Sequence, residues 1–160
     1  MNGRVITALL VAALAAAPPG ALGADAQRRA QVERNGERVM PFSLGATMHA
    51  FDLTGDGGVQ TVRVHTGDAH QIALVRSHLR KEAAAFARGD FTDPASIHGG
   101  AMPGLKAMHA GARRIDVRYA DVPHGAAITY ATQDPALVAA IHAWFRAQVS
   151  DHGAHATMKM

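Results

Sequence analysis

Asp134-Pro135-Ala136-Leu137-Val138 opens a stretch near the C-terminus that runs to Asp151-His152-Gly153 and predicts a complete helix. The Asp134 carboxylate can accept hydrogen bonds from the free N–H groups of a first turn, and Pro135 suits the first helical position because no N–H is needed there. Gly153 can end the helix because it adopts left-handed backbone conformations at little cost. One apolar face recurs at helical spacing, and it consists of Leu137, Val138, Ile141, Phe145 and Val149.

A second helix with the same signals is predicted earlier in the chain. Asp68 caps a stretch from Ala69 to Arg88, which Gly89 closes. Its apolar stripe consists of Ile72, Val75, Leu79, Ala83 and Phe86.

Two alternating apolar segments precede each helix and predict strands. Residues 47–53 and 59–65 flank the hairpin signal Thr54-Gly55-Asp56-Gly57-Gly58, and residues 114–120 and 126–131 flank a second turn. When Asp68 is aligned with Asp134, Val62 falls opposite Ile128 and Leu79 opposite Phe145. Duplication of a ββα unit explains the match, and so does the general likeness of amphipathic ββα units. The pattern predicts an α+β fold in which two ββα repeats form a four-stranded antiparallel sheet with two helices packed on one face.

The sequence predicts four parts of the chain: a targeting segment, an N-terminal arm, one domain and a C-terminal tail. Residues 1–26 have a basic start, an apolar run and small residues before cleavage after Ala24 or Ala26, which is typical of a secretory signal peptide. The alternative is a membrane anchor, but the apolar run is short for a span. The remaining divisions are a polar N-terminal arm at 27–46, a single α+β domain at 47–152 (ββα at 47–89, loop at 90–112, ββα at 113–152) and a His/Met tail at 153–160.

The composition excludes some classes of function and favours one. The absence of cysteine excludes disulfides and thiolate chemistry, and a net charge of +3 on an exported chain argues against a nucleic-acid partner. No phosphate-binding loop, nucleophile elbow, zinc-protease motif or dinucleotide fingerprint occurs, so the sequence gives no indication of an enzyme. The chain has ten histidines and seven methionines. Imidazole is the commonest protein ligand of transition metals, and thioether sulfur favours soft ions such as Cu(I).

Two groups of candidate metal ligands follow from the predicted elements. His49 shares the inner face of its strand with Phe51 and Leu53, where a buried imidazole needs a hydrogen bond or a metal. Each candidate has an alternative interpretation. For His49 it is a strand-end histidine bonded to a backbone carbonyl, and for His142 a partly buried residue at the boundary of its helix. For Met102 it is a side chain that fills the core, and for the tail a frayed terminus. The internal candidates are His49, His98, Met102 and His142, and the candidates in the tail are His152, His155, Met158 and Met160.

Four segments stand out by their motifs, and they are Glu37-Arg38-Val39-Met40, Thr47-Met48-His49-Ala50-Phe51, Ile97-His98-Gly99 with Met102-Pro103-Gly104, and Ala140-Ile141-His142-Ala143-Trp144-Phe145-Arg146. Over roughly residues 33 to 152, the chain resembles a family of small exported bacterial proteins of unknown function in these segments. The resemblance implies an exported domain in which His49, His98 and His142 recur. Members sometimes carry an aspartate carbamoyltransferase label, but this chain is too short for that enzyme and lacks its Ser-Thr-Arg-Thr-Arg phosphate loop.

These observations predict an exported, periplasmic or secreted protein that binds a transition metal, copper first, for buffering, transfer or resistance. One alternative is a metal-free module that presents its sheet face or the 90–112 loop to an envelope protein. Another is a small enzyme of unknown class.

Overall fold

The computed structural model describes residues 19–159 of the chain. Most of the predicted signal peptide, residues 1–18, lies outside the described residues, as does Met160 of the predicted tail site. The described elements are α1 (Pro19–Val39), β1 (Thr47–Thr54), β2 (Gly57–Val64), α2 (Ala69–Ala87), α3 (Thr92–His98), α4 (Leu105–Gly111), β3 (Asp116–Val122), β4 (Gly125–Ala131), α5 (Pro135–His152) and β5 (Ala156–Lys159), with short 3-10 turns at Leu44–Ala46, Ala112–Arg114 and Gly153–His155.

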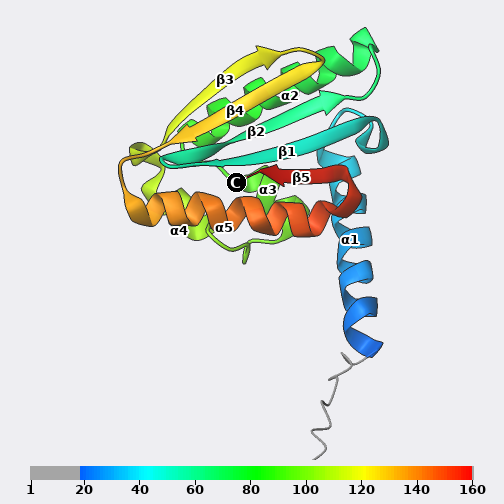
Figure 1. The fold of residues 1–160 in the computed structure, drawn as a ribbon, viewed down its shortest axis with the longest axis horizontal. Helices are drawn as coiled ribbons and strands as arrows, with labels where there is room; N and C mark the ends of the chain where they lie inside the picture. Colours follow the sequence, from blue (N-terminus) through cyan, green and yellow to red (C-terminus); the bar gives the residue numbers. More distant parts are fainter. Residues whose placement is uncertain (1–18, 160) are drawn as a thin grey trace, which may run out of the picture.

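The strands form one mixed five-stranded sheet in the order β3-β4-β2-β1-β5 (Figure 1). The β1–β2, β2–β4 and β3–β4 pairs are antiparallel, and β5 runs parallel to β1 with Phe51 opposite Met158. The predicted first hairpin is confirmed, because Thr54 pairs with Gly57 across a two-residue turn.

The predicted architecture of four antiparallel strands and two helices is wrong. The described residues contain five α-helices and a fifth strand, and that strand makes the sheet mixed. The fifth strand was missed because residues 153–160 lack the alternating apolar pattern of a strand. Residues 156–159 pair through their backbone with the edge of β1, which a sequence pattern does not reveal.

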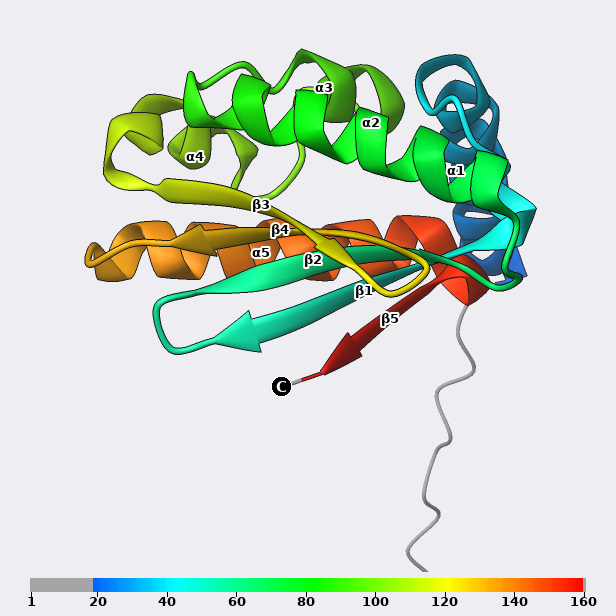
Figure 2. The same ribbon diagram turned by 90° about the horizontal axis from the view of Figure 1, so that it is seen from above.

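The helices that follow the two hairpins cover each other's strands. α2 follows β2 but contacts mainly β3 and β4, whereas α5 follows β4 but contacts β2, β1 and β5. Both helices pack on the same sheet face, where Phe51 meets Phe145 of α5 and Tyr130 meets Phe86 of α2. Figure 2 shows both helices extending along the sheet. Residues of α2, α3 and α5 line a cavity on this side of the sheet.

The structure confirms both predicted ends of α5, but the buried face of the helix differs from the predicted one. Asp134 Oδ1 accepts a hydrogen bond from the Ala136 N–H at 2.9 Å, and Gly153 ends the helix with a φ of 55°. Val138 and Val149 are only partly buried. α1 and α4 also contact α5, in addition to the sheet. The buried face of α5 therefore extends to Trp144, Gln148 and Asp151.

The segment predicted as an exposed arm, residues 27–46, instead lies largely within α1 and packs against the domain. α1 contacts α3 and α5, with Val32 buried and Arg28 bonded to α5 (Figure 1). The 90–112 segment, predicted to be an irregular loop, forms α3 and α4. No helix in the described part of the chain combines the length and the apolar character that a membrane crossing requires.

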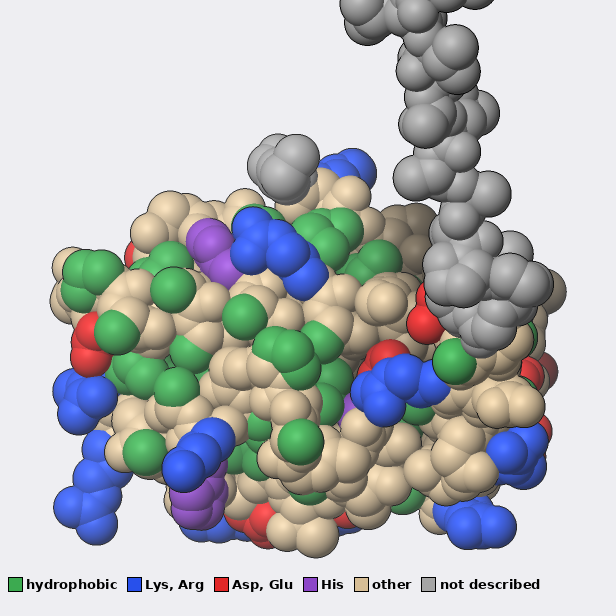
Figure 3. Space-filling view, turned by 90° about the horizontal axis from the view of Figure 1, so that it is seen from below, with side chains coloured by type: hydrophobic (Ala, Val, Ile, Leu, Met, Phe, Trp, Pro, Cys, Tyr) green, Lys and Arg blue, Asp and Glu red, His purple; other side chains and the backbone are tan. Residues whose placement is uncertain are grey.

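The surface on the α5 side shows no field of a single charge sign (Figure 3). On this face of the described residues, Lys and Arg side chains lie apart from one another, with Asp and Glu between them. Hydrophobic side chains are scattered over the middle of the face.

Candidate functional site

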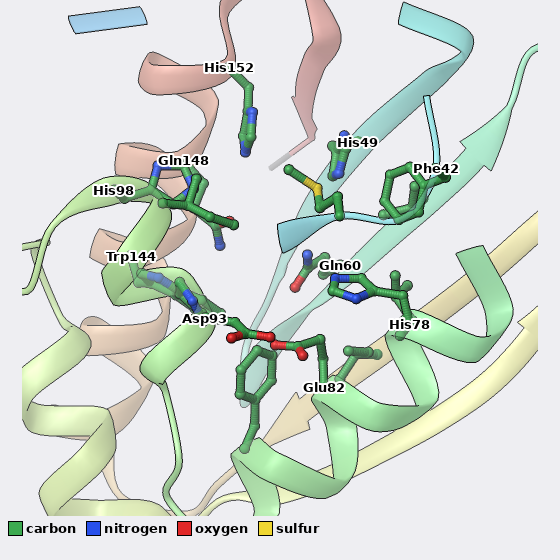
Figure 4. A pocket seen from close by; sticks show the side chains of 17 residues that line it. Phe42, His49, Gln60, His78, Glu82, Asp93, His98, Trp144, Gln148 and His152 are labelled. Carbon is green, nitrogen blue, oxygen red and sulfur yellow. The ribbon is translucent and has the colours of Figure 1, made fainter. Parts of the chain in front are cut away.

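Three histidines from three separate elements meet where β1, α3 and the end of α5 come together. The His49 and His152 rings are stacked, with centroids 5.0 Å apart and planes 7° apart. The His98 ring lies edge-on to His152 at 4.9 Å. We call His49, His98 and His152 the histidine cluster; Figure 4 shows all three around one cavity.

Each histidine of the cluster is placed by a different local feature of the fold. His49 is on the inner face of β1 and is 4% exposed, as the strand alternation predicts. His98 ends α3 and is 6% exposed. His152 is the last residue of α5 and is partly buried.

Asp151 fixes the orientation of His98. His98 Nδ1 lies 2.9 Å from Asp151 Oδ2, and because a carboxylate can only accept, Nδ1 carries the hydrogen and donates it. Arg28 of α1 donates to both oxygens of the same carboxylate, from Nε at 2.6 Å and from Nη2 at 2.7 Å. In this arrangement His98 Nε2 keeps its lone pair, and a carboxylate behind an imidazole is the usual support of a metal-binding histidine.

The imidazoles of the cluster stay neutral at physiological pH. Burial, together with the neighbouring His78 and His98, lowers the pKa of His49 to about 4. Burial, together with His49 and His98, lowers the pKa of His152 to about 2. Burial also lowers the pKa of His98, although hydrogen bonding to Asp151 opposes that shift. Neutral imidazole is the form that binds a metal.

The remaining wall of the cavity carries polar groups that sequence reasoning missed. Met40 and Phe42 line it from the segment after α1, His78 and Glu82 from α2, Asp93 from α3, and Trp144 and Gln148 from α5 (Figure 4). One sequence signal could have identified the polar residues that α5 contributes to the cavity. Trp144, Gln148 and Asp151 recur at spacings of four and three, which places polar groups on one helical face with the tryptophan.

Glu82 is a carboxyl group that keeps its proton. It is 6% exposed, and its carboxyl points toward that of Asp93 (Figure 4). Burial, hydrogen bonding to Asp93 and the Asp93 charge raise the pKa of Glu82 to about 8. On the same side of the cavity, burial lowers the pKa of His78 to about 4.

Of the other predicted site residues, His155 lines a neighbouring pocket together with His49 and His152, and the rest do not join the cluster. His142 Nε2 lies 3.0 Å from the Thr54 carbonyl and 2.8 Å from the Gly57 carbonyl, which ties α5 to the first hairpin. Met102 is 5% exposed and part of the hydrophobic core. His155 is exposed in the turn before β5, and Met158 is partly buried on β5. Met160 lies outside the described residues.

As they stand, no three or more histidine, aspartate or glutamate side chains within residues 19–159 are grouped so that they could hold a metal ion. The stacking of His49 on His152 accounts for this at the cluster, because parallel rings do not aim their nitrogens at a common point.

Replacement of His142 with glutamine tests its structural role. The shorter amide loses the hydrogen bond that the ring makes to the Thr54 and Gly57 carbonyls, so we expect the free energy of unfolding to fall by about 1–2 kcal/mol. Urea unfolding measures the loss. The exposed His65→Gln variant is the matched control and should have the wild-type free energy of unfolding. A wild-type free energy of unfolding in His142→Gln would show that this hydrogen bond does not stabilise the fold.

Protein-family models, curated proteins and solved structures were all compared with this chain, and none matches. The resemblance to small exported bacterial proteins therefore stays a prediction.

Proposed function

We propose that the protein binds one transition-metal ion, copper first, through His49, His98 and His152. The observation that carries this proposal is the meeting of three neutral imidazoles, from three elements distant in sequence, at one buried place. The predicted role is buffering, transfer or resistance in the compartment outside the cytoplasm.

The spacing of the rings supports a shared ion. Imidazoles that bind one ion through nitrogens at about 2 Å have ring centroids about 5 Å apart. The His49–His152 and His98–His152 centroids are already 5.0 and 4.9 Å apart. The ring planes differ from what a shared ion requires, so binding needs rotation of the side chains but no movement of β1, α3 or α5.

The type of ligand atom favours copper over harder ions. The nearest carboxylate, Asp151, is already bonded to Arg28 and His98. Met40 adds a thioether to the wall of the same cavity. Imidazole binds Cu(I), Cu(II) and Zn(II), and thioether sulfur favours Cu(I), so this set of ligands fits copper in either oxidation state and Cu(I) best.

Competition titrations with Cu(I) under anaerobic conditions, and with Cu(II) and Zn(II), test the proposal. We expect one equivalent of Cu(I) to bind with a Kd well below about 1 μM, and Zn(II) to bind more weakly. Metal binding should also change the fluorescence of Trp144, the single tryptophan of the chain, which lines the same cavity. If no metal binds more tightly than about 1 μM, the proposal is wrong.

Replacement of Asp151 with asparagine tests the support of His98. Loss of the charge weakens both the His98 contact and the Arg28 contact, so we expect copper affinity to fall about 10-fold or more. The free energy of unfolding should also fall, by about 1–3 kcal/mol. Asp116→Asn, which changes an exposed aspartate on β3, is the matched control. Unchanged copper affinity in folded Asp151→Asn would show that Asp151 does not support the site.

A further inference from the structure

The α5 wall of the cavity has two polar groups that find no partner within residues 19–159. Trp144 Nε1 and Gln148 Nε2 are buried and make no hydrogen bond to any group in this part of the chain. The two residues are 1% and 5% exposed, and both line the cavity (Figure 4). Both atoms carry hydrogens, so both are donors that lack an acceptor. Buried donors without an acceptor are costly, and native proteins rarely leave two in one place.

Hydrogen-bond acceptors line the same cavity. The carboxyl groups of Glu82 and Asp93 point toward each other, and Gln60 lines the cavity from β2 (Figure 4). The donors without a partner therefore come from α5, and the carboxyl groups come from α2 and α3.

The charge of the wall points to a neutral occupant. No arginine or lysine lines the cavity. The nearest lysine, Lys81, is 71% exposed and bonds Asp93 from outside at 3.2 Å. An anion buried here would lack a cationic partner, and a cation would find Glu82 protonated at neutral pH.

We propose that this cavity binds a small neutral amide or urea. Its carbonyl oxygen accepts from Trp144 Nε1 and Gln148 Nε2, and its N–H groups donate toward Glu82 and Asp93. The cavity volume of about 50 Å³ sets the size of the molecule. A single water needs about 10–15 Å³ on the same measure, so there is room for roughly three to five non-hydrogen atoms. A molecule of this size binds at best in the range of tens of micromolar, so we expect a Kd between about 0.1 and 10 mM.

The site requires no metal, so it is tested in protein kept metal-free with a chelator. Acetamide is the probe, and acetate and acetone are its matched comparators: acetate is the anion of the same shape, and acetone lacks the N–H donors. Trp144 fluorescence and isothermal titration report binding. We expect a saturable response to acetamide, with acetate and acetone at least about 5-fold weaker. No saturable response up to about 100 mM acetamide, which is the result if ordered water alone satisfies the donors, would overturn the inference. Equal binding of acetate or acetone would overturn it too.

Two variants test the assigned donors. Gln148→Leu removes one donor and fills a similar volume, and Trp144→Phe removes the other while keeping an aromatic ring; for the latter, titration calorimetry replaces fluorescence. Each should weaken acetamide binding at least about 5-fold, whereas the exposed His70→Gln should not. Wild-type acetamide affinity in either folded donor variant would overturn the assignment, and if one variant fails to fold, the other still tests it. Loss of copper binding in the histidine variants leaves this result unaffected, so the two proposals fail separately.

Discussion

Replacement of His152 with glutamine should weaken Cu(I) binding by at least about 100-fold, and His98→Gln should do the same. Loss of one of three imidazole ligands costs at least as much as the 10–100-fold that follows from loss of a group that merely supports a ligand. His152 is the ring that touches both of the others, at 5.0 and 4.9 Å, so its removal also separates His49 from His98. Competition with a chromophoric chelator measures the affinity.

Stability and metal binding are separated by controls. His152 is partly exposed at the end of α5, so glutamine should leave the protein folded, as circular dichroism would show. His70→Gln, at an exposed position early in α2, should keep the wild-type affinity. If both folded cluster variants bind Cu(I) within about 3-fold of the wild type, copper binds elsewhere in the chain.

The metal-free protein should be most stable near pH 6.5 and should lose at least about 2 kcal/mol of unfolding free energy by pH 4.5. His49 and His78 have folded-state pKa values near 4, below the ordinary value of 6.5. Between about pH 4 and 6.5 the unfolded chain therefore binds protons that the folded chain does not, and stability falls as the pH falls. His152 and His98, whose pKa values are also lowered, add to this loss.

Glu82 has the opposite effect on stability and determines how the free energy of unfolding depends on pH above pH 6.5. Its folded-state pKa is about 8 against an ordinary value of 4.5, so the folded chain holds a proton that the unfolded chain releases. This stabilisation is complete below pH 4.5 and is lost as the pH rises toward 8, which offsets part of the histidine effect and lowers stability above pH 6.5. Urea unfolding followed by Trp144 fluorescence measures the profile. In Glu82→Gln, the free energy of unfolding should fall less steeply above pH 6.5 and more steeply as the pH falls below 6.5. Wild-type stability that stays constant from pH 4.5 to 6.5 would show that the histidines are not held neutral by the fold.

The helices, strands and hairpin that local patterns specify were predictable from the sequence. Asp134 and Gly153 bound α5 because capping depends on residues within one turn of the helix end. The burial of His49 followed from strand alternation. β5 and the packing of α1 were not predictable, because they depend on contacts across the whole chain, such as Arg28 with Asp151.

The site was predicted in part for the same reason. His49, His98 and His152 were all candidates, but the sequence separated His152 from the internal group because the tail appeared unstructured. His142 was included because it lies beside the apolar face of α5, and its hydrogen bonds to the first hairpin appear only when β1 and β2 are placed against the helix. Gln148 and Asp151 were missed because polar residues on a helix normally face solvent, and only the packing of other elements, α1 among them, against α5 buries them.

X-ray absorption spectroscopy of the protein loaded with one equivalent of Cu(I) tests whether the three histidines bind the metal, because it identifies the ligand atoms. We expect the multiple-scattering pattern of imidazole ligands from His49, His98 and His152. A single sulfur contribution from Met40 should disappear in Met40→Leu. A spectrum without imidazole scattering, or one that His98→Gln and His152→Gln leave unchanged, would contradict the proposed site.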